Sequence, residues 1–258
     1  MREGKFMYEE RLEYLAGFIR QLDRRRPCES NKYPLKIDFR VFSGIPPLHG
    51  AAPVLLATGW GSGWEGIAPL AFSFACEGFD VVLLSFPGYG NSENPPPNFY
   101  KFGGLYRNCA VAATNILKTA GFSKAYFVGH SMGAEILAKA AAICPRASEK
   151  LVLMNPSGVR PVSGFWAKAA LAWRFAASGA KLRREYHRSK RSKDDYLKPL
   201  IDMCGQQKSP WGWGRRRQRW AEFKELCKGQ LPKILENVTC PVVFFSGDRD
   251  TVYPAYES

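Results

Sequence analysis

The residues best suited to chemistry are Gly129-His130-Ser131-Met132-Gly133, which fit the pattern G-x-S-x-G. An apolar run over residues 124–128 precedes them, and a helical pattern over residues 134–143 follows. A serine on such a strand-to-helix turn is strained, and the turn lifts its hydroxyl above the sheet. We therefore predict that Ser131 is a nucleophile. The alternative is a glycine-rich turn that holds an incidental serine.

A second glycine-rich segment, Thr-Gly-Trp-Gly-Ser-Gly at residues 58–63, directly follows an apolar run over residues 53–57. Acyl transfer needs two N–H donors aimed at one developing oxyanion. One donor would be the N–H of Met132, at a helix N-terminus that favours negative charge. The other would come from the loop that carries Trp60. We predict Met132 and Trp60 as the oxyanion hole.

Two carboxylates, Asp248 and Asp250, follow the apolar run over residues 241–245. At the end of a strand, either could orient a catalytic histidine. Either could instead close a turn or cap a helix. The residues alone leave both choices open.

The chain contains three histidines, and none stands where the base is needed. His49 precedes the run over residues 53–57, so we expect it at the amino edge of the sheet, opposite Ser131. His130 adjoins Ser131, and the sharp turn should direct its side chain into packing or a cap contact. His187 lies among arginines and lysines that would lower its basicity. We expect His187 to be solvated, and the alternative is that the cap brings it to the site. We predict that the base is absent from this sequence.

Strand and helix patterns alternate along most of the chain. Strands are predicted over residues 36–42, 53–57, 80–84, 124–128, 151–154 and 241–245, and helices over residues 8–26, 67–77, 105–120 and 134–143. Strands that are apolar on both faces and alternate with helices indicate a parallel sheet covered on both sides.

A basic segment interrupts this pattern between residues 161 and 233. Residues 160–233 hold 19 Lys and Arg against six Asp and Glu, so they carry nearly all of the net charge of +14. The segment also contains Trp166, Trp173, Trp211, Trp213 and Trp220. We predict three parts: an N-terminal amphipathic helix and linker (1–35), a core (36–160 and 234–258) and a basic helical cap (161–233).

One face of the predicted cap is apolar. It carries Phe165, Trp166, Ala169, Ala170, Trp173 and Ala177. We expect this face to pack over the crevice while the cations stay solvated, which would favour an apolar acyl substrate. Cations beside tryptophans can also bind nucleic acid or an anionic membrane. Binding to an anionic membrane surface is our alternative hypothesis for the cap. Nucleic acid is disfavoured.

With these motifs in order, the chain resembles the α/β-hydrolase superfamily over most of residues 36–258. That family usually has His-Gly-x-Gly in its oxyanion loop, and here Thr58 replaces the histidine. Residues 86–92 and 151–156 are similar to the family's next loop and to its strand before the cap. The resemblance implies that the acid is Asp250, not Asp248.

The resemblance also places the base after the acid strand, yet the sequence ends at Ser258. We therefore expect it to lack the last strand, the histidine loop and a final helix. The implied function is a serine hydrolase that cleaves a small or lipid-like ester through an acyl-enzyme on Ser131. The alternative is a non-catalytic binding protein that uses the pocket or the cap.

Other features narrow the class of protein. The seven cysteines include no Cys-x-x-Cys pair, which favours free thiols over zinc or disulfides. No cofactor, metal or membrane span is predicted. The charged N-terminus has no apolar signal region, so we expect a cytoplasmic protein.

Overall fold

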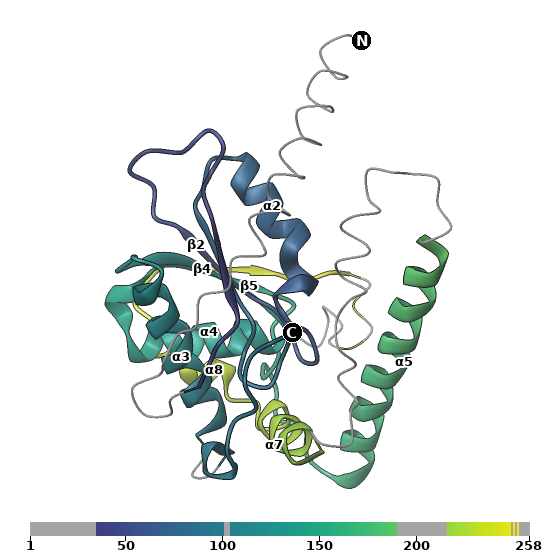
Figure 1. Cartoon of the computed structure of the whole chain (residues 1–258). Helices are drawn as coiled ribbons and strands as arrows, with labels where there is room; N and C mark the ends of the chain where they lie inside the picture. The colour runs from purple at the N-terminus through teal and green to yellow at the C-terminus, as the bar shows by residue number, and fades with distance from the viewer. Residues whose placement is uncertain (1–34, 101–103, 190–215, 249, 251, 253–258) are drawn as a thin grey trace.

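The computed structural model describes residues 35–100, 104–189, 216–248, 250 and 252. Its centre is a sheet with the strand order β1-β3-β2-β4-β5-β6 (Figure 1). The strands are β1 (Phe39–Phe42), β2 (Val54–Ala57), β3 (Val81–Leu84), β4 (Ala125–His130), β5 (Ser148–Met154) and β6 (Val242–Phe245). Strand β1 is antiparallel to β3, and the other neighbours are parallel. The predicted mostly parallel α/β sheet is confirmed.

Helices cover both faces of this sheet. The described helices of the chain are α2 (Ala68–Cys76), α3 (Leu105–Thr119), α4 (Met132–Ile143), α5 (Phe165–Ser189), α7 (Arg216–Leu226) and α8 (Leu231–Leu235), with short 3-10 turns η1 (Trp64–Ile67), η2 (Pro97–Tyr100) and η3 (Pro145–Ala147). Helix α2 lies on one face, and α3, α4 and α8 lie on the other (Figure 1). Within β2, Leu55 packs on the α3 and α4 side and Leu56 on the α2 side, because side chains alternate along a strand.

The strand order determines where a ligand crevice forms. From the central strand β2 the chain first adds β3 on one side and then β4 on the other. The loops that leave β2 and β4 therefore separate at the carboxyl edge of the sheet, where open α/β sheets bind their ligands. Thr58 follows β2 and Ser131 follows β4, so both candidate motifs lie at this edge.

Some element bounds differ from the sequence predictions. Helix α4 begins at Met132, directly after Ser131, and β5 begins three residues early at Ser148. Strand β1 is shorter than the predicted residues 36–42, and most of its side chains are buried. Arg40 is buried, pairs with Asp38 and lies 5.2 Å from the ring centre of Trp64. The predicted helix over residues 8–26 lies outside the described residues.

The segment between β5 and β6 contains α5, α7 and α8, and the prediction for its aromatic face is wrong. Phe165, Trp166 and Trp173 are 76%, 82% and 74% exposed, and Ala169, Ala170 and Ala177 are also exposed. Leu171 is buried and Phe175 half-buried, so α5 packs through the opposite face. Figure 1 shows α5 standing beside the body, apart from the sheet. In the described ranges, no helix has the length and apolarity that a membrane crossing requires.

Candidate active site

Ser131 lies on the turn between β4 and α4 with φ 54° and ψ −121°. This left-handed conformation costs a non-glycine residue about 1–3 kcal/mol, so its surroundings must hold it in place. The Ser131 N–H donates to the carbonyl of Met154 at 2.9 Å. The Ser131 carbonyl accepts the N–H groups of Ala134 at 3.1 Å and Ser157 at 3.2 Å. The turn is therefore bonded on both sides.

Three glycines leave the space that this turn requires. A Cβ atom on Gly129 would lie 2.4 Å from the Cα of Ala134, and one on Gly133 would lie 2.5 Å from the carbonyl oxygen of Thr58. A Cβ atom on Gly59 would lie 2.9 Å from the Cβ of Ser131 and 3.4 Å from its hydroxyl oxygen. A side chain at Gly129 or Gly133 would collide with backbone, and one at Gly59 would collide with the Ser131 side chain. The loop after β2 therefore lies directly against Ser131.

The two predicted oxyanion donors belong to segments that meet at Ser131. Met132 is the first residue of α4, and N–H groups in a first helical turn have no partner within the helix. Trp60 follows Gly59, the residue in contact with Ser131. The partial positive charge at the N-terminus of α4 would also stabilise an oxyanion at this position.

Asp250 is held at the carboxyl edge of β5 and β6. Its carboxylate accepts hydrogen bonds from the side-chain amide of Asn155 at 2.5 Å and from the N–H of Val252 at 2.7 Å. Asn155 follows β5 with a φ of 43°, a conformation that asparagine tolerates better than most residues. Asp248 is exposed. The carboxylate of Asp250, not that of Asp248, is thus bonded in place.

The histidines are distributed as follows. His49 is exposed in the loop before β2, at the amino edge of the sheet. The side chain of His130 is exposed and its Nδ1 lies against the Gly59 loop. Desolvation lowers the pKa of His130, and the charge of Asp250 opposes that shift. His187 is within α5, and its side chain lies outside the described residues. Across the described ranges, the structure records no hydrogen bond between a histidine and the Ser131 hydroxyl.

A buried carboxylate that the sequence reasoning missed joins α7 to the site. Glu222 accepts hydrogen bonds from the Trp60 indole N–H and the Tyr89 hydroxyl, both at 2.6 Å. It also accepts from Gln218 at 2.8 Å and pairs with Arg219 at 3.4 Å. Burial raises the pKa of Glu222, while Arg219 and the hydrogen bonds lower it. The only signal of this role in the sequence was that Glu222 falls at an inward-facing position of the helix.

Aromatic side chains continue this link between the insertion and the loop after β2. The Trp60 ring meets Phe175 of α5 edge-on at 4.8 Å and lies 6.2 Å from Phe223 of α7. Leu171, Phe223 and Cys227 form a small buried cluster around which Trp60 packs. Helices α5 and α7 therefore hold the Trp60 side chain by apolar contact as well as through Glu222.

A second buried acid, Glu135, lies beneath the nucleophile turn in α4. It accepts a hydrogen bond from the Ser157 hydroxyl at 2.8 Å. Burial raises the pKa of Glu135 to about 7, against the opposing effect of the Ser157 hydrogen bond. Ser157 also donates its N–H to Ser131, so Glu135 braces the loop that supports the turn.

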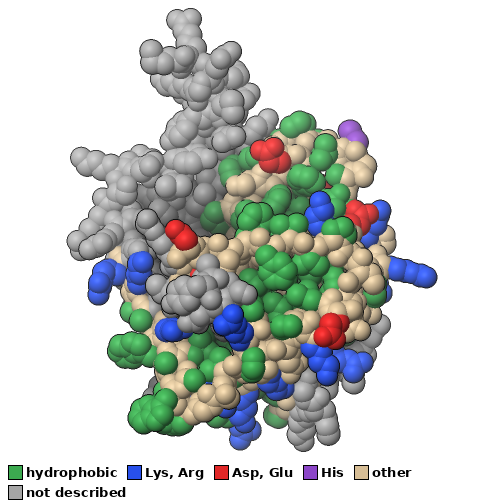
Figure 2. All heavy atoms as spheres, turned by 180° about the vertical axis from the view of Figure 1, so that it is seen from behind, with side chains coloured by type: hydrophobic (Ala, Val, Ile, Leu, Met, Phe, Trp, Pro, Cys, Tyr) green, Lys and Arg blue, Asp and Glu red, His purple; other side chains and the backbone are tan. Residues whose placement is uncertain are grey.

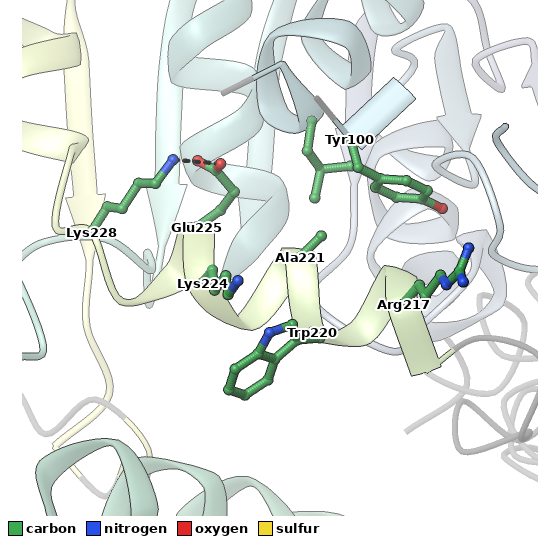
Figure 3. Close-up of a pocket in the computed structure, with 8 residues that line it drawn as sticks. Tyr100, Arg217, Trp220, Ala221, Lys224, Glu225 and Lys228 are labelled. Atoms are coloured by element: carbon green, nitrogen blue, oxygen red, sulfur yellow. Dashed lines mark hydrogen bonds and ion pairs between the residues drawn. The ribbon is translucent and has the colours of Figure 1, made fainter. Parts of the chain in front are cut away.

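A surface groove of about 320 Å³ runs along α7 on the side away from Glu222. Tyr100 and Leu105 form one wall, and Trp220 and Lys224 belong to α7 (Figure 3). Lys228 pairs with Glu225 at 2.6 Å. This groove contains neither Ser131 nor Asp250. Within the ranges that the structure describes, no group of three His, Cys, Asp or Glu is arranged to hold a metal ion.

The chain is similar to known hydrolases. An uncharacterized hydrolase of Bacillus subtilis is 26% identical over 208 residues, covering 74% of this chain and 72% of that protein. A 2-hydroxy-6-oxo-6-phenylhexa-2,4-dienoate hydrolase of Burkholderia cepacia is 31% identical over 112 residues, covering 43% of this chain and only 36% of that protein. The match to the second relative therefore spans about a third of its length.

The fold is shared with solved structures. An esterase from Exiguobacterium antarcticum superimposes with a TM-score of 0.64 at 15% identity, covering 90% of this chain and 84% of that one. The model of the alpha/beta hydrolase family matches residues 48–258, which include the Gly59 loop, Ser131 and Asp250. The chain therefore belongs to the alpha/beta hydrolase family.

Proposed function

We propose that this protein is a serine hydrolase that cleaves a small or lipid-like carboxylic ester through an acyl-enzyme on Ser131. The observation that carries the proposal is the strained turn of Ser131 with Gly59 packed against it. A serine on such a turn presents its hydroxyl above the sheet, where a substrate can reach it. The esterase from Exiguobacterium antarcticum shares this fold, which is compatible with an ester substrate.

In the proposed reaction the Ser131 hydroxyl oxygen attacks the ester carbonyl carbon, and an imidazole accepts its proton. The N–H groups of Met132 and Trp60 hold the oxyanion. The imidazole then protonates the leaving alcohol, and water hydrolyses the acyl-enzyme by the same path. Asp250 orients the imidazole. Its hydrogen bonds from Asn155 and Val252 hold the carboxylate in place for this role.

We further propose that the imidazole comes from a histidine outside these 258 residues. The exposed position of His49 at the far edge of the sheet supports this assignment. So does the absence of a recorded hydrogen bond from any described histidine to Ser131. Without the imidazole, Ser131 should be a weak nucleophile.

Labelling with a fluorophosphonate probe tests this proposal. We expect slow labelling of the 258-residue chain and none of Ser131→Ala, which preserves the fold. A chain continued along its reading frame to the next stop codon should label at least about a hundredfold faster, the usual contribution of a general base. Equal labelling of the two lengths would show that the base is misassigned, and labelling of Ser131→Ala would exclude Ser131.

The second candidate is a non-catalytic binding protein that keeps the pocket. The missing contact between Ser131 and a described imidazole is the observation that favours it. This candidate predicts that the continued chain also fails to label, while a non-hydrolysable ester analogue still binds.

A further inference from the structure

Helix α5 presents an aromatic face that the described part of the chain leaves uncovered. Phe165, Trp166 and Trp173 each expose about three quarters or more of their surface, and Trp220 of α7 exposes 59%. Single exposed apolar residues are common, but several large aromatics gathered on one face mark an interaction site. The fold does not use these side chains.

The geometry of α5 explains why this face is free. Each residue advances a helix by about 100°, which puts Leu171 and Phe175 on the side opposite Trp166 and Trp173. Leu171 packs in the cluster with Phe223, and Phe175 meets the Trp60 ring. One face thus anchors α5 to the loop beside Ser131, and the other points away from the protein.

The described charged side chains beside the exposed face are cationic. Lys181 and Arg184 are exposed on α5, and the one acid of α5, Glu185, has a side chain outside the described residues. Lys224 of α7 is exposed and lies 5.3 Å from the Trp220 ring centre. Figure 2 views the molecule from behind, so α5 lies on the left. Hydrophobic side chains protrude there at the lower left, with Lys and Arg side chains above them.

We propose that this α5 surface, formed by Phe165, Trp166, Trp173, Lys181 and Arg184, docks on an anionic phospholipid bilayer. The helix lies in the plane of the interface. Its aromatic rings enter the headgroup level, and its cations meet lipid phosphates and carboxylates. The exposed Ala169, Ala170 and Ala177 complete an apolar strip that suits acyl chains and that a nucleic-acid backbone would not use.

Docking has a consequence for the proposed function, although it does not depend on it. The inward face of α5 contacts Trp60, so a bound membrane would lie about one helix diameter, ~10 Å, from the loop beside Ser131. This arrangement suits a substrate that partitions into lipid.

Vesicle co-sedimentation of the 258-residue chain tests the proposal. We expect binding to phosphatidylcholine vesicles that contain phosphatidylserine, and little to phosphatidylcholine alone. Raising the salt concentration should weaken binding, because it screens the cations. Lys181→Ala and Arg184→Ala should each reduce the partition coefficient about fivefold. Trp166→Ala with Trp173→Ala should reduce it at least about tenfold.

The matched control is Phe244→Ala, which removes an aromatic side chain of 53% exposure from β6. It should leave vesicle binding unchanged. Circular dichroism should show that every variant folds, since each replaced side chain is exposed. Equal binding to both vesicle types, or wild-type binding by the tryptophan double variant, would overturn the proposal.

The oligomeric state of the wild-type chain and of the tryptophan double variant in solution is the second test of the proposal. If the wild-type chain is a dimer in solution and the double variant a monomer, a second copy covers the face and the membrane proposal is wrong. Labelling of Ser131 is not part of this test, so docking and hydrolysis can fail independently.

Discussion

Helices α4 and α5 are both rich in alanine, yet they occupy opposite environments. Most of α4 is buried, because it lies between the sheet and helices α3 and α8. Most of the described side chains of α5 are exposed, and its main anchors are Leu171 and Phe175. A high content of apolar residues therefore indicates that a helix packs against another surface, but it does not indicate which surface that is. Helix α4 finds it within the fold, and we propose that α5 finds it in lipid.

The largest expected effect comes from placing a charge on each helix. Ala138 of α4 is fully buried and Ala169 of α5 is exposed. Ala138→Lys should lower the free energy of unfolding by about 4 kcal/mol, because the ammonium is desolvated without a partner. Ala169→Lys should change it by less than about 0.5 kcal/mol. Urea denaturation measures both, and similar losses would mean that α5 is as buried as α4.

The next effect is a pH dependence of stability that Glu135 gives to α4. The pKa of Glu135 is raised to about 7 in the folded protein, so the folded state binds more protons than the unfolded state between about pH 4.5 and 7. Stability due to this group is therefore present at low pH and declines by about 3 kcal/mol as pH rises to 7.

Glu135→Gln keeps an acceptor for Ser157 and removes the titration. Glu222 also has a raised pKa, so the informative quantity is the difference between the stability curves of wild type and Glu135→Gln. A difference that stays constant from pH 4.5 to 7 would show that Glu135 does not titrate there.

The third-largest effect is expected from removal of the Glu222 carboxylate, which connects α7 to the loop after β2. Glu222→Ala leaves the Trp60 indole and the Tyr89 hydroxyl without their acceptor and should cost about 2 kcal/mol. It should also slow labelling of Ser131, since the loop after β2 loses its tie to α7. Glu222→Gln should recover part of both properties. Unchanged labelling in the alanine variant would mean that α7 does not position the loop.

Relief of strain at the start of α4 is a smaller effect of opposite sign. Ser131→Gly permits the φ of 54° without a Cβ penalty and should raise the free energy of unfolding by about 1 kcal/mol. Ser131→Ala should not, because alanine keeps the Cβ atom. Thermal unfolding compares the two, and equal melting temperatures would show that the turn is relaxed.

The smallest expected effect concerns the exposed face of α5. Trp166→Ala and Trp173→Ala should each change stability by less than about 0.5 kcal/mol, because these side chains are exposed. A loss of several kcal/mol in urea denaturation would mean that the rings pack against the protein and are not available to a membrane.

Much of the candidate site was predictable because its signals are local. The glycines around Ser131 act within a few residues of it, and the order of strands and helices leads to the sheet that carries it. The choice of Asp250 over Asp248 rested on family resemblance. The structure adds the bonds from Asn155 and Val252 that distinguish the two.

The sequence by itself determined that a parallel sheet would carry a strained serine at one edge, because strand periodicity and glycine sterics operate over short distances. Only the tertiary structure decided which face of α5 is buried and that Glu222 bonds to Trp60. Those contacts join residues 115 and 162 positions apart, and no local pattern encodes a pairing over such separations. The same helix periodicity fits either face, so the choice depends on the partner that folding brings to it.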